Sequence, residues 1–178
     1  MSFLSFFLAM RVFSRLAKIA SASIFGVLLM ASSSAGAAYH AVDESRAASP
    51  EFQIRFSKTL SDTPQDGRLL LMLSNTDRDE PRFLINNWLV TQLIFGQNVE
   101  AWKPAEIALI DSDTLGFPIS STAQIPPGHY FVQALLNRYH TFHLSNGKVV
   151  SLPPDRGEGQ RWNRKPGNFL STPFAVDI

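Results

Sequence analysis

The sequence predicts an all-β sandwich, and three observations carry that prediction. Short apolar or alternating runs recur at close spacing through residues 51–178. Clusters of Gly, Pro, Asn, Asp and Ser separate these runs and are typical of turns. No stretch of this region shows the apolar period of an amphipathic helix. Together these features are typical of two antiparallel sheets that pack face to face.

Individual strands are predicted from the spacing of apolar residues. In residues 51–57 large apolar residues alternate with polar ones, which indicates a half-buried strand. Residues 68–74 form a short continuous apolar run, which favours a strand buried on both faces. Asn146-Gly147 accepts the positive φ angles of a type I′ turn and predicts a hairpin between residues 140–144 and 149–152. The remaining strand candidates are residues 90–96, 104–110, 129–141 and 169–176.

The N-terminal residues 1–37 carry the three parts of an export signal. Three basic residues, the last of them Lys18, precede an apolar run over residues 19–30, and Ala35-Gly36-Ala37 supplies a cleavage motif. The apolar run is shorter than the roughly 20 residues that a bilayer span needs. We therefore predict a signal-peptide helix that is removed on export, and a bacterial protein that is periplasmic or secreted.

Two alternatives stay open at this end of the chain. Translation could begin at Met10 instead of Met1. If the apolar residues 1–9 are translated, residues 1–30 could stay in the inner membrane as an anchor, and membrane contact is predicted only in that case. The predicted organisation is a signal peptide over residues 1–37, a flexible leader over residues 38–50 and a β-sandwich domain over residues 51–178.

Composition narrows the classes of function for the processed chain. Removal of the signal peptide, residues 1–37, leaves 13 Lys and Arg against 15 Asp and Glu, so a basic surface for nucleic acid is not predicted. The chain has no cysteine, which excludes thiolate chemistry and cysteine-ligated zinc and means that an apolar core must stabilise the domain. The motifs G-x-S-x-G, H-E-x-x-H, G-x-G-x-x-G and the Walker loop do not occur. We therefore predict no catalytic residues and no cofactor.

Several residues have the chemistry of metal ligands, but their spacing favours other structures. His140 and His143 fall on opposite faces of a strand, because successive side chains alternate. The run that starts at Asp111 opens like a calcium loop but fails at its later ligand positions, so we predict a turn in which Asp111 or Asp113 accepts backbone N–H groups. No metal site is predicted. A further acidic cluster is predicted to be a solvated loop with compensating arginines: Asp77, Asp79 and Glu80 with Arg78 and Arg82.

The segment of residues 161–168 is the strongest candidate for ligand binding. Trp162 offers a flat ring that could stack on a sugar or a base, while Asn163 and Arg164 offer directional hydrogen-bond donors. The competing interpretation, which the sequence favours, is that Trp162 packs on the sandwich and fastens an otherwise irregular C-terminal segment.

Four stretches of the chain together resemble a known family. They are residues 67–74, the turn from Ala108 to Pro118, residues 125–137 and residues 158–168. Taken together they are similar to the N-terminal immunoglobulin-like domain of bacterial exported esterases. This resemblance implies an immunoglobulin-like antiparallel β-sandwich, which in the family precedes an α/β-hydrolase domain. No residue of this chain maps onto the family's serine, acid or histidine, so esterase activity does not carry over.

The expected function is therefore that of an exported, non-catalytic accessory or interaction domain. Its expected partners are a hydrolase domain or another exported protein, with a carbohydrate as a further candidate. A carbohydrate-binding module is the first alternative, and it requires two or more exposed aromatic rings on one flat face, from among Trp88, Trp102, Tyr139 and Trp162. A hydrolase with a site that the sequence does not reveal is the second alternative, and it requires Asp111, Asp113 and His143 to converge.

Overall fold

The computed structural model describes residues 6–11, 49–88, 90–155, 157, 159 and 161–178. All strand pairs among these residues are antiparallel, and their helical elements are single 3₁₀ turns, η1 (Pro81–Phe83) and η2 (Thr122–Gln124). The predicted all-β class is confirmed. Residues 1–5 and 12–37 of the predicted signal peptide, with the helix expected there, lie outside the described residues. Of the predicted signal peptide only Phe6–Arg11 is described, and it forms a strand.

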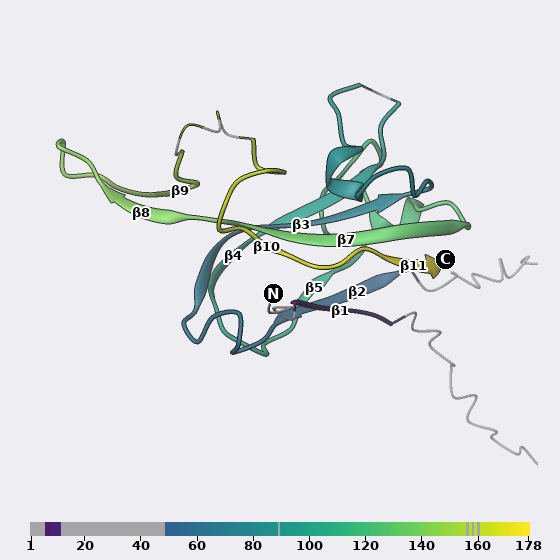
Figure 1. The fold of residues 1–178 in the computed structure, drawn as a ribbon, viewed down its shortest axis with the longest axis horizontal. Helices are drawn as coiled ribbons and strands as arrows, with labels where there is room; N and C mark the ends of the chain where they lie inside the picture. The colour runs from purple at the N-terminus through teal and green to yellow at the C-terminus, as the bar shows by residue number, and fades with distance from the viewer. Residues whose placement is uncertain (1–5, 12–48, 89, 156, 158, 160) are drawn as a thin grey trace, which may run out of the picture.

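Two sheets and one separate hairpin make up the structure (Figure 1). The larger sheet has the order β10-β7-β3-β4-β6, and β11 also pairs with β7. Its strands are β3 (Gln65–Ser74), β4 (Leu93–Trp102), β6 (Gly116–Phe117), β7 (His129–Arg138), β10 (Phe169–Leu170) and β11 (Phe174–Asp177). The smaller sheet has the order β1-β2-β5 and contains β1 (Phe6–Arg11), β2 (Glu51–Phe56) and β5 (Ala108–Ile110). The hairpin joins β8 (His140–His143) to β9 (Val149–Leu152).

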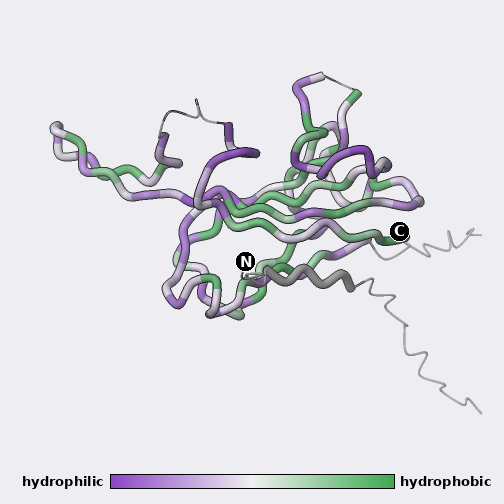
Figure 2. Tube along the Cα trace, viewed as in Figure 1, coloured by the Kyte–Doolittle hydropathy of each residue, from purple (hydrophilic) through white to green (hydrophobic). Residues whose placement is uncertain are grey.

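The main core lies between the two sheets. The alternation in β2 buries Phe52, Ile54 and Phe56 completely, as the sequence pattern predicts. They pack with the inward residues of β3, β4, β5 and β7, and Figure 2 shows hydrophobic residues gathered along these strands. Phe56 lies at the centre of an aromatic group, with its ring centroid 4.9 Å from that of Trp102 and 5.6 Å from that of Phe169.

The outer face of the larger sheet is also covered, which explains why β3 is apolar on both faces. Met72 on this face is fully buried, and Gln133 beside it on β7 is 1% exposed. Two segments outside the strands supply the cover, residues 75–88 with 90–92 and residues 161–168. The prediction that the run over residues 68–74 is buried on both faces is confirmed for residues 71–74, whereas Arg68 and Leu70 on the outer face are only partly buried.

The hairpin is confirmed, but the long strand predicted before it is divided in two. The turn of the hairpin is not of type I′, because Gly147 has a φ of +80° but Asn146 does not have a positive φ. The Gly147 N–H donates to the Leu144 carbonyl, and the Leu144 N–H donates to the Lys148 carbonyl across the turn. The prediction of one strand over residues 129–141 is wrong, because β7 ends at Arg138 and the Tyr139 N–H turns to the Asp66 carbonyl. Beyond this point β8 and β9 project from the body as a two-stranded arm (Figure 1).

Candidate ligand-binding site

A pocket of about 490 Å³ opens on the outer face of the larger sheet. Strands β3, β4 and β7 form its floor, while the loop after η1 and the C-terminal segment form its walls. Its size lies within the range of small-molecule sites in proteins. Its lining residues are Arg68, Leu70, Ile85, Asn86, Asn87, Ile94, Phe117, Asn137, Tyr139 and Trp162.

The floor of the pocket follows from the register of the central strands. Arg68 on β3 lies opposite Asn98 on β4 and opposite Asn137 on β7, so the three residues form one polar row across the sheet. The Arg68 guanidinium donates to the Asn98 side-chain oxygen at 3.2 Å. In the next row Leu70 lies opposite Gly96, where an added Cβ would be 2.7 Å from Leu70 and 3.2 Å from Arg68. The bare glycine therefore leaves room for both side chains to lie over the sheet.

The wall formed by residues 85–88 and 90–92 is held by side-chain hydrogen bonds. The Asn86 N–H donates to the Thr91 hydroxyl at 2.9 Å, and the Asn86 side-chain oxygen accepts from the Trp88 N–H at 2.8 Å. Where this loop leaves and rejoins the sheet, the Asn75 N–H donates to the side-chain oxygen of Gln92. These bonds fix the loop over the sheet and place the Asn86 amide at the pocket.

The opposite wall is Trp162, and its neighbours fasten the segment that carries it. The Trp162 carbonyl accepts from the Asn168 amide at 2.8 Å. Asn163 and Arg82 bond each other reciprocally, because the Asn163 amide donates to the Arg82 carbonyl and the Arg82 guanidinium donates to the Asn163 carbonyl. The Arg164 guanidinium lies 4.5 Å from the centroid of the Phe83 ring, in cation–π contact. Of the three residues predicted to bind ligand, Trp162 lines the pocket, whereas Asn163 and Arg164 attach its wall to η1.

A polar network beneath η1 supports this attachment. The Arg82 guanidinium donates a hydrogen bond to each carboxylate oxygen of Glu80, at 2.8 and 3.2 Å. The buried Gln133 amide donates to the same carboxylate at 2.7 Å, and its oxygen accepts from the Arg82 N–H. The hydrogen bond from Arg82 lowers the pKa of Glu80 below its ordinary value, partial burial opposes this shift, and the bond from Gln133 adds to it. The carboxylate is therefore ionised at neutral pH.

Replacing Glu80 by glutamine is expected to reduce the acid sensitivity of the fold. Since the pKa of Glu80 is lower in the folded state than in the unfolded state, its ionisation stabilises the fold above pH about 4.5. That contribution is lost as the pH falls through the folded-state pKa. The effect is modest because the Glu80 side chain is 39% exposed. Urea unfolding at pH 7 and at pH 3 gives the free energy of unfolding at each pH. Between pH 7 and pH 3 this free energy should fall more for the wild type than for E80Q. An equal loss in the two proteins would contradict this assignment.

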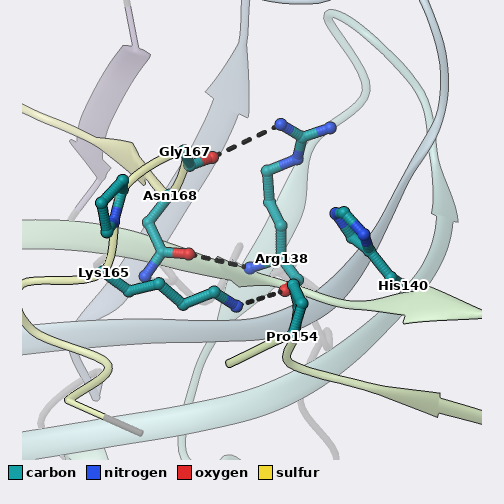
Figure 3. A pocket seen from close by; sticks show the side chains of 7 residues that line it. Arg138, His140, Pro154, Lys165, Gly167 and Asn168 are labelled. Atoms are coloured by element: carbon teal, nitrogen blue, oxygen red, sulfur yellow. Dashed lines mark hydrogen bonds between the residues drawn. The ribbon is translucent and has the colours of Figure 1, made fainter. Parts of the chain in front are cut away.

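A second, smaller pocket of about 210 Å³ lies at the junction of β7 and β8 (Figure 3). Arg138 makes two hydrogen bonds at this pocket. Its guanidinium donates to the Gly167 carbonyl, and its backbone N–H donates to the side-chain oxygen of Asn168. The buried Lys165 ammonium donates to the Arg138 carbonyl at 3.0 Å. These bonds fasten the C-terminal segment to the end of β7, so this pocket helps to hold the Trp162 wall in place.

The four aromatic residues considered for sugar stacking differ in location and in exposure. Tyr139 and Trp162 both line the larger pocket, and both are half-buried. Trp102 is 4% exposed and belongs to the core, where its indole N–H donates to the Glu106 carbonyl. Trp88 is 77% exposed on the adjoining loop. Two rings therefore share one pocket, but both are half-buried, so the two exposed rings on one flat face that a carbohydrate-binding module requires are found only in part.

The residues of the hydrolase alternative do not come together. Asp111 accepts hydrogen bonds from the Asp113 N–H and the Thr114 hydroxyl, which is the turn that the sequence predicts. The loop that carries both aspartates leads into β6, which pairs with β4 at Ile94 and Phe95. His143 lies on the projecting hairpin, beyond the opposite end of the sheet (Figure 1). In the described part of the chain, no three His, Asp or Glu side chains are grouped as metal ligands.

Sequence reasoning missed most of the pocket lining. Arg68, Asn86 and Asn137 lie in three separate stretches, and none belongs to a recognisable motif. Strand register and the fold of the loop bring them together. These residues could have been suspected only because polar or charged residues stand at the ends of apolar runs. Most strands show that pattern, so it does not identify a pocket.

No family model, curated protein or solved structure matches this chain. Among the described residues, no helix is both long and apolar enough to span a bilayer.

Proposed function

We propose that this chain is an exported, non-catalytic accessory domain that binds a carbohydrate. The observation that carries the proposal is the meeting of Trp162 and Tyr139 in one pocket with Arg68 and three asparagines. Two segments far apart in the sequence supply the two rings, and each segment is fastened by its own hydrogen bonds. The pocket is thus preorganised, which reduces the entropy cost of binding.

The chemistry of the lining matches that of a sugar ring. A pyranose presents apolar C–H faces, which stack on aromatic rings, and a rim of hydroxyl groups. Asn86, Asn87 and Asn137 each carry an amide, and the Arg68 guanidinium adds donors beside the one that Asn98 accepts. The oxygens of Asn86 and Asn137 already accept from the Trp88 N–H and the Lys165 ammonium, and each keeps a second lone pair for a ligand. None of the described lining residues carries a carboxylate or an imidazole. The lining therefore supplies recognition groups for a neutral sugar or for one with a single acidic substituent.

An accessory role fits this binding chemistry. The resemblance to the N-terminal domain of exported esterases supports a domain that acts beside a hydrolase domain or another exported protein. A periplasmic or secreted protein meets the glycans of the cell envelope, and an uncleaved anchor would keep it at the inner membrane. In this proposal the pocket brings a glycan to the partner's active site, and the partner performs the chemistry.

Replacing Trp162 or Tyr139 by alanine is expected to weaken carbohydrate binding about ten-fold or more, since each ring supplies a stacking face. The measurement is titration calorimetry with a panel of neutral and acidic oligosaccharides. Trp88→Ala is the matched control, because Trp88 is exposed on the adjoining loop but does not line the pocket.

Unfolding curves of the same variants separate stacking from anchoring. If Trp162→Ala unfolds more easily while Tyr139→Ala binds normally, Trp162 is a fastener of the segment and the stacking role is wrong. If the panel yields no ligand for the wild type, the carbohydrate proposal fails.

A further inference from the structure

The outer edge of β2 holds a strand that comes from the predicted signal peptide. β1 pairs antiparallel with β2 along its full length, from Phe6 opposite Phe56 to Arg11 opposite Glu51. On its other edge β2 pairs with β5. In the chain that still carries residues 6–11, β2 is therefore an interior strand.

Processing would turn β2 into an edge strand. Cleavage after Ala37 removes all of β1, and β2 then loses its backbone partners from Glu51 to Phe56. An open edge of this kind is a template for another strand, because its N–H and C=O groups need partners. β2 is also a principal strand of the core, with three fully buried side chains. The edge that opens is therefore held rigidly in an extended form.

The sequence of β1 shows what this edge accepts. Apolar residues occupy the register positions opposite the three buried residues of β2, with Phe6 opposite Phe56 and Leu8 opposite Ile54. The run from Phe6 to Met10 is apolar at every position. Any strand that replaces β1 in the same register would need apolar residues at least at alternate positions.

We propose that the β2 edge of the processed protein is a strand-acceptor site for an extended, apolar segment of a partner protein. The segment pairs antiparallel with Glu51–Phe56, and main-chain hydrogen bonds supply much of the affinity. A second copy of β2 can place Phe52, Ile54 and Phe56 at the alternate positions opposite the buried residues. It fits less well than β1, because Gln53 and Arg55 then occupy the positions where β1 carries Phe7 and Ala9. The site lies on the smaller sheet, so it is separate from the pocket of Trp162.

For the test, a bacterium expresses the chain of residues 1–178 and exports it, and the exported protein is purified after any cleavage of the signal peptide. Intact-mass measurement defines its N-terminus. The probe is a synthetic peptide of residues 5–12, SFFLAMRV, and the matched control peptide carries the changes L8D and M10D. For a chain that starts at Ala38, the probe is expected to raise the thermal midpoint with increasing concentration. The control peptide should bind at least about ten-fold more weakly.

A chain that keeps its own strand is the complementary control. The substitution A37L alters the cleavage motif, so β1 should stay on the edge and the peptide should have no effect. Both proteins are measured in the same mild detergent. Three results would overturn the proposal. The exported chain retains residues 6–11, or the thermal midpoint rises equally with both peptides or with neither of them. The third such result is a processed dimer that the probe peptide does not dissociate.

Discussion

Replacing Phe56 by alanine is expected to lower the free energy of unfolding by about 4 kcal/mol. Phe56 is fully buried and contacts the rings of Trp102 and Phe169, which belong to the other sheet. Its removal forfeits the transfer of a large ring from water and leaves a cavity between rigid strands, which cannot collapse onto it. Urea unfolding followed by circular dichroism gives the change directly.

The control for this substitution is the same change at a surface phenylalanine. Phe142 on the hairpin is 39% exposed, so Phe142→Ala should change stability by no more than about 0.5 kcal/mol. Similar effects at the two positions would mean that the two sheets do not share the core that the structure shows.

Replacing Gly67 by alanine is expected to destabilise the protein by about 3 kcal/mol, at the upper end of typical overpacking costs. Gly67 lies on the central strand β3, between β4 and β7. An added Cβ would lie 2.4 Å from the Asn137 carbonyl oxygen, a backbone atom of β7 that cannot rotate away. The two strands would have to separate at this end of the sheet.

Gly128→Ala provides the matched comparison, since the atom nearest to its added Cβ is 3.6 Å away and belongs to the Tyr130 side chain. That variant should keep wild-type stability. The strand end that Gly67 holds also carries Asn137 and Tyr139, so G67A should weaken ligand binding more than its loss of stability explains. A G67A protein as stable as G128A would show that β3 and β7 are not packed this closely.

The strands that the sequence predicted best are those whose patterns are local. The alternation over residues 51–57 reflects one buried and one solvated face, and β2 occupies Glu51–Phe56. The hairpin turn needs only the freedom of Gly147 to adopt a positive φ, although the type I′ geometry predicted for Asn146-Gly147 is not the one that forms. Boundaries were less accurate where pairing extends a strand through polar residues. β4 continues to Trp102 because it pairs with β3 as far as Gln65, although residues 97–101 are not an apolar run.

The sequence by itself determined the all-β class, the hairpin, and the aromatic and polar character of the segment around Trp162. These features depend on side-chain period and local backbone preference, which neighbouring residues establish. Only the tertiary structure decided that Trp102 joins the core while Trp162 lines a pocket, because burial of a tryptophan depends on what packs against it from elsewhere in the chain. It also decided that Arg68, Asn137 and Tyr139 meet, because strand register is set by pairing between segments far apart in sequence.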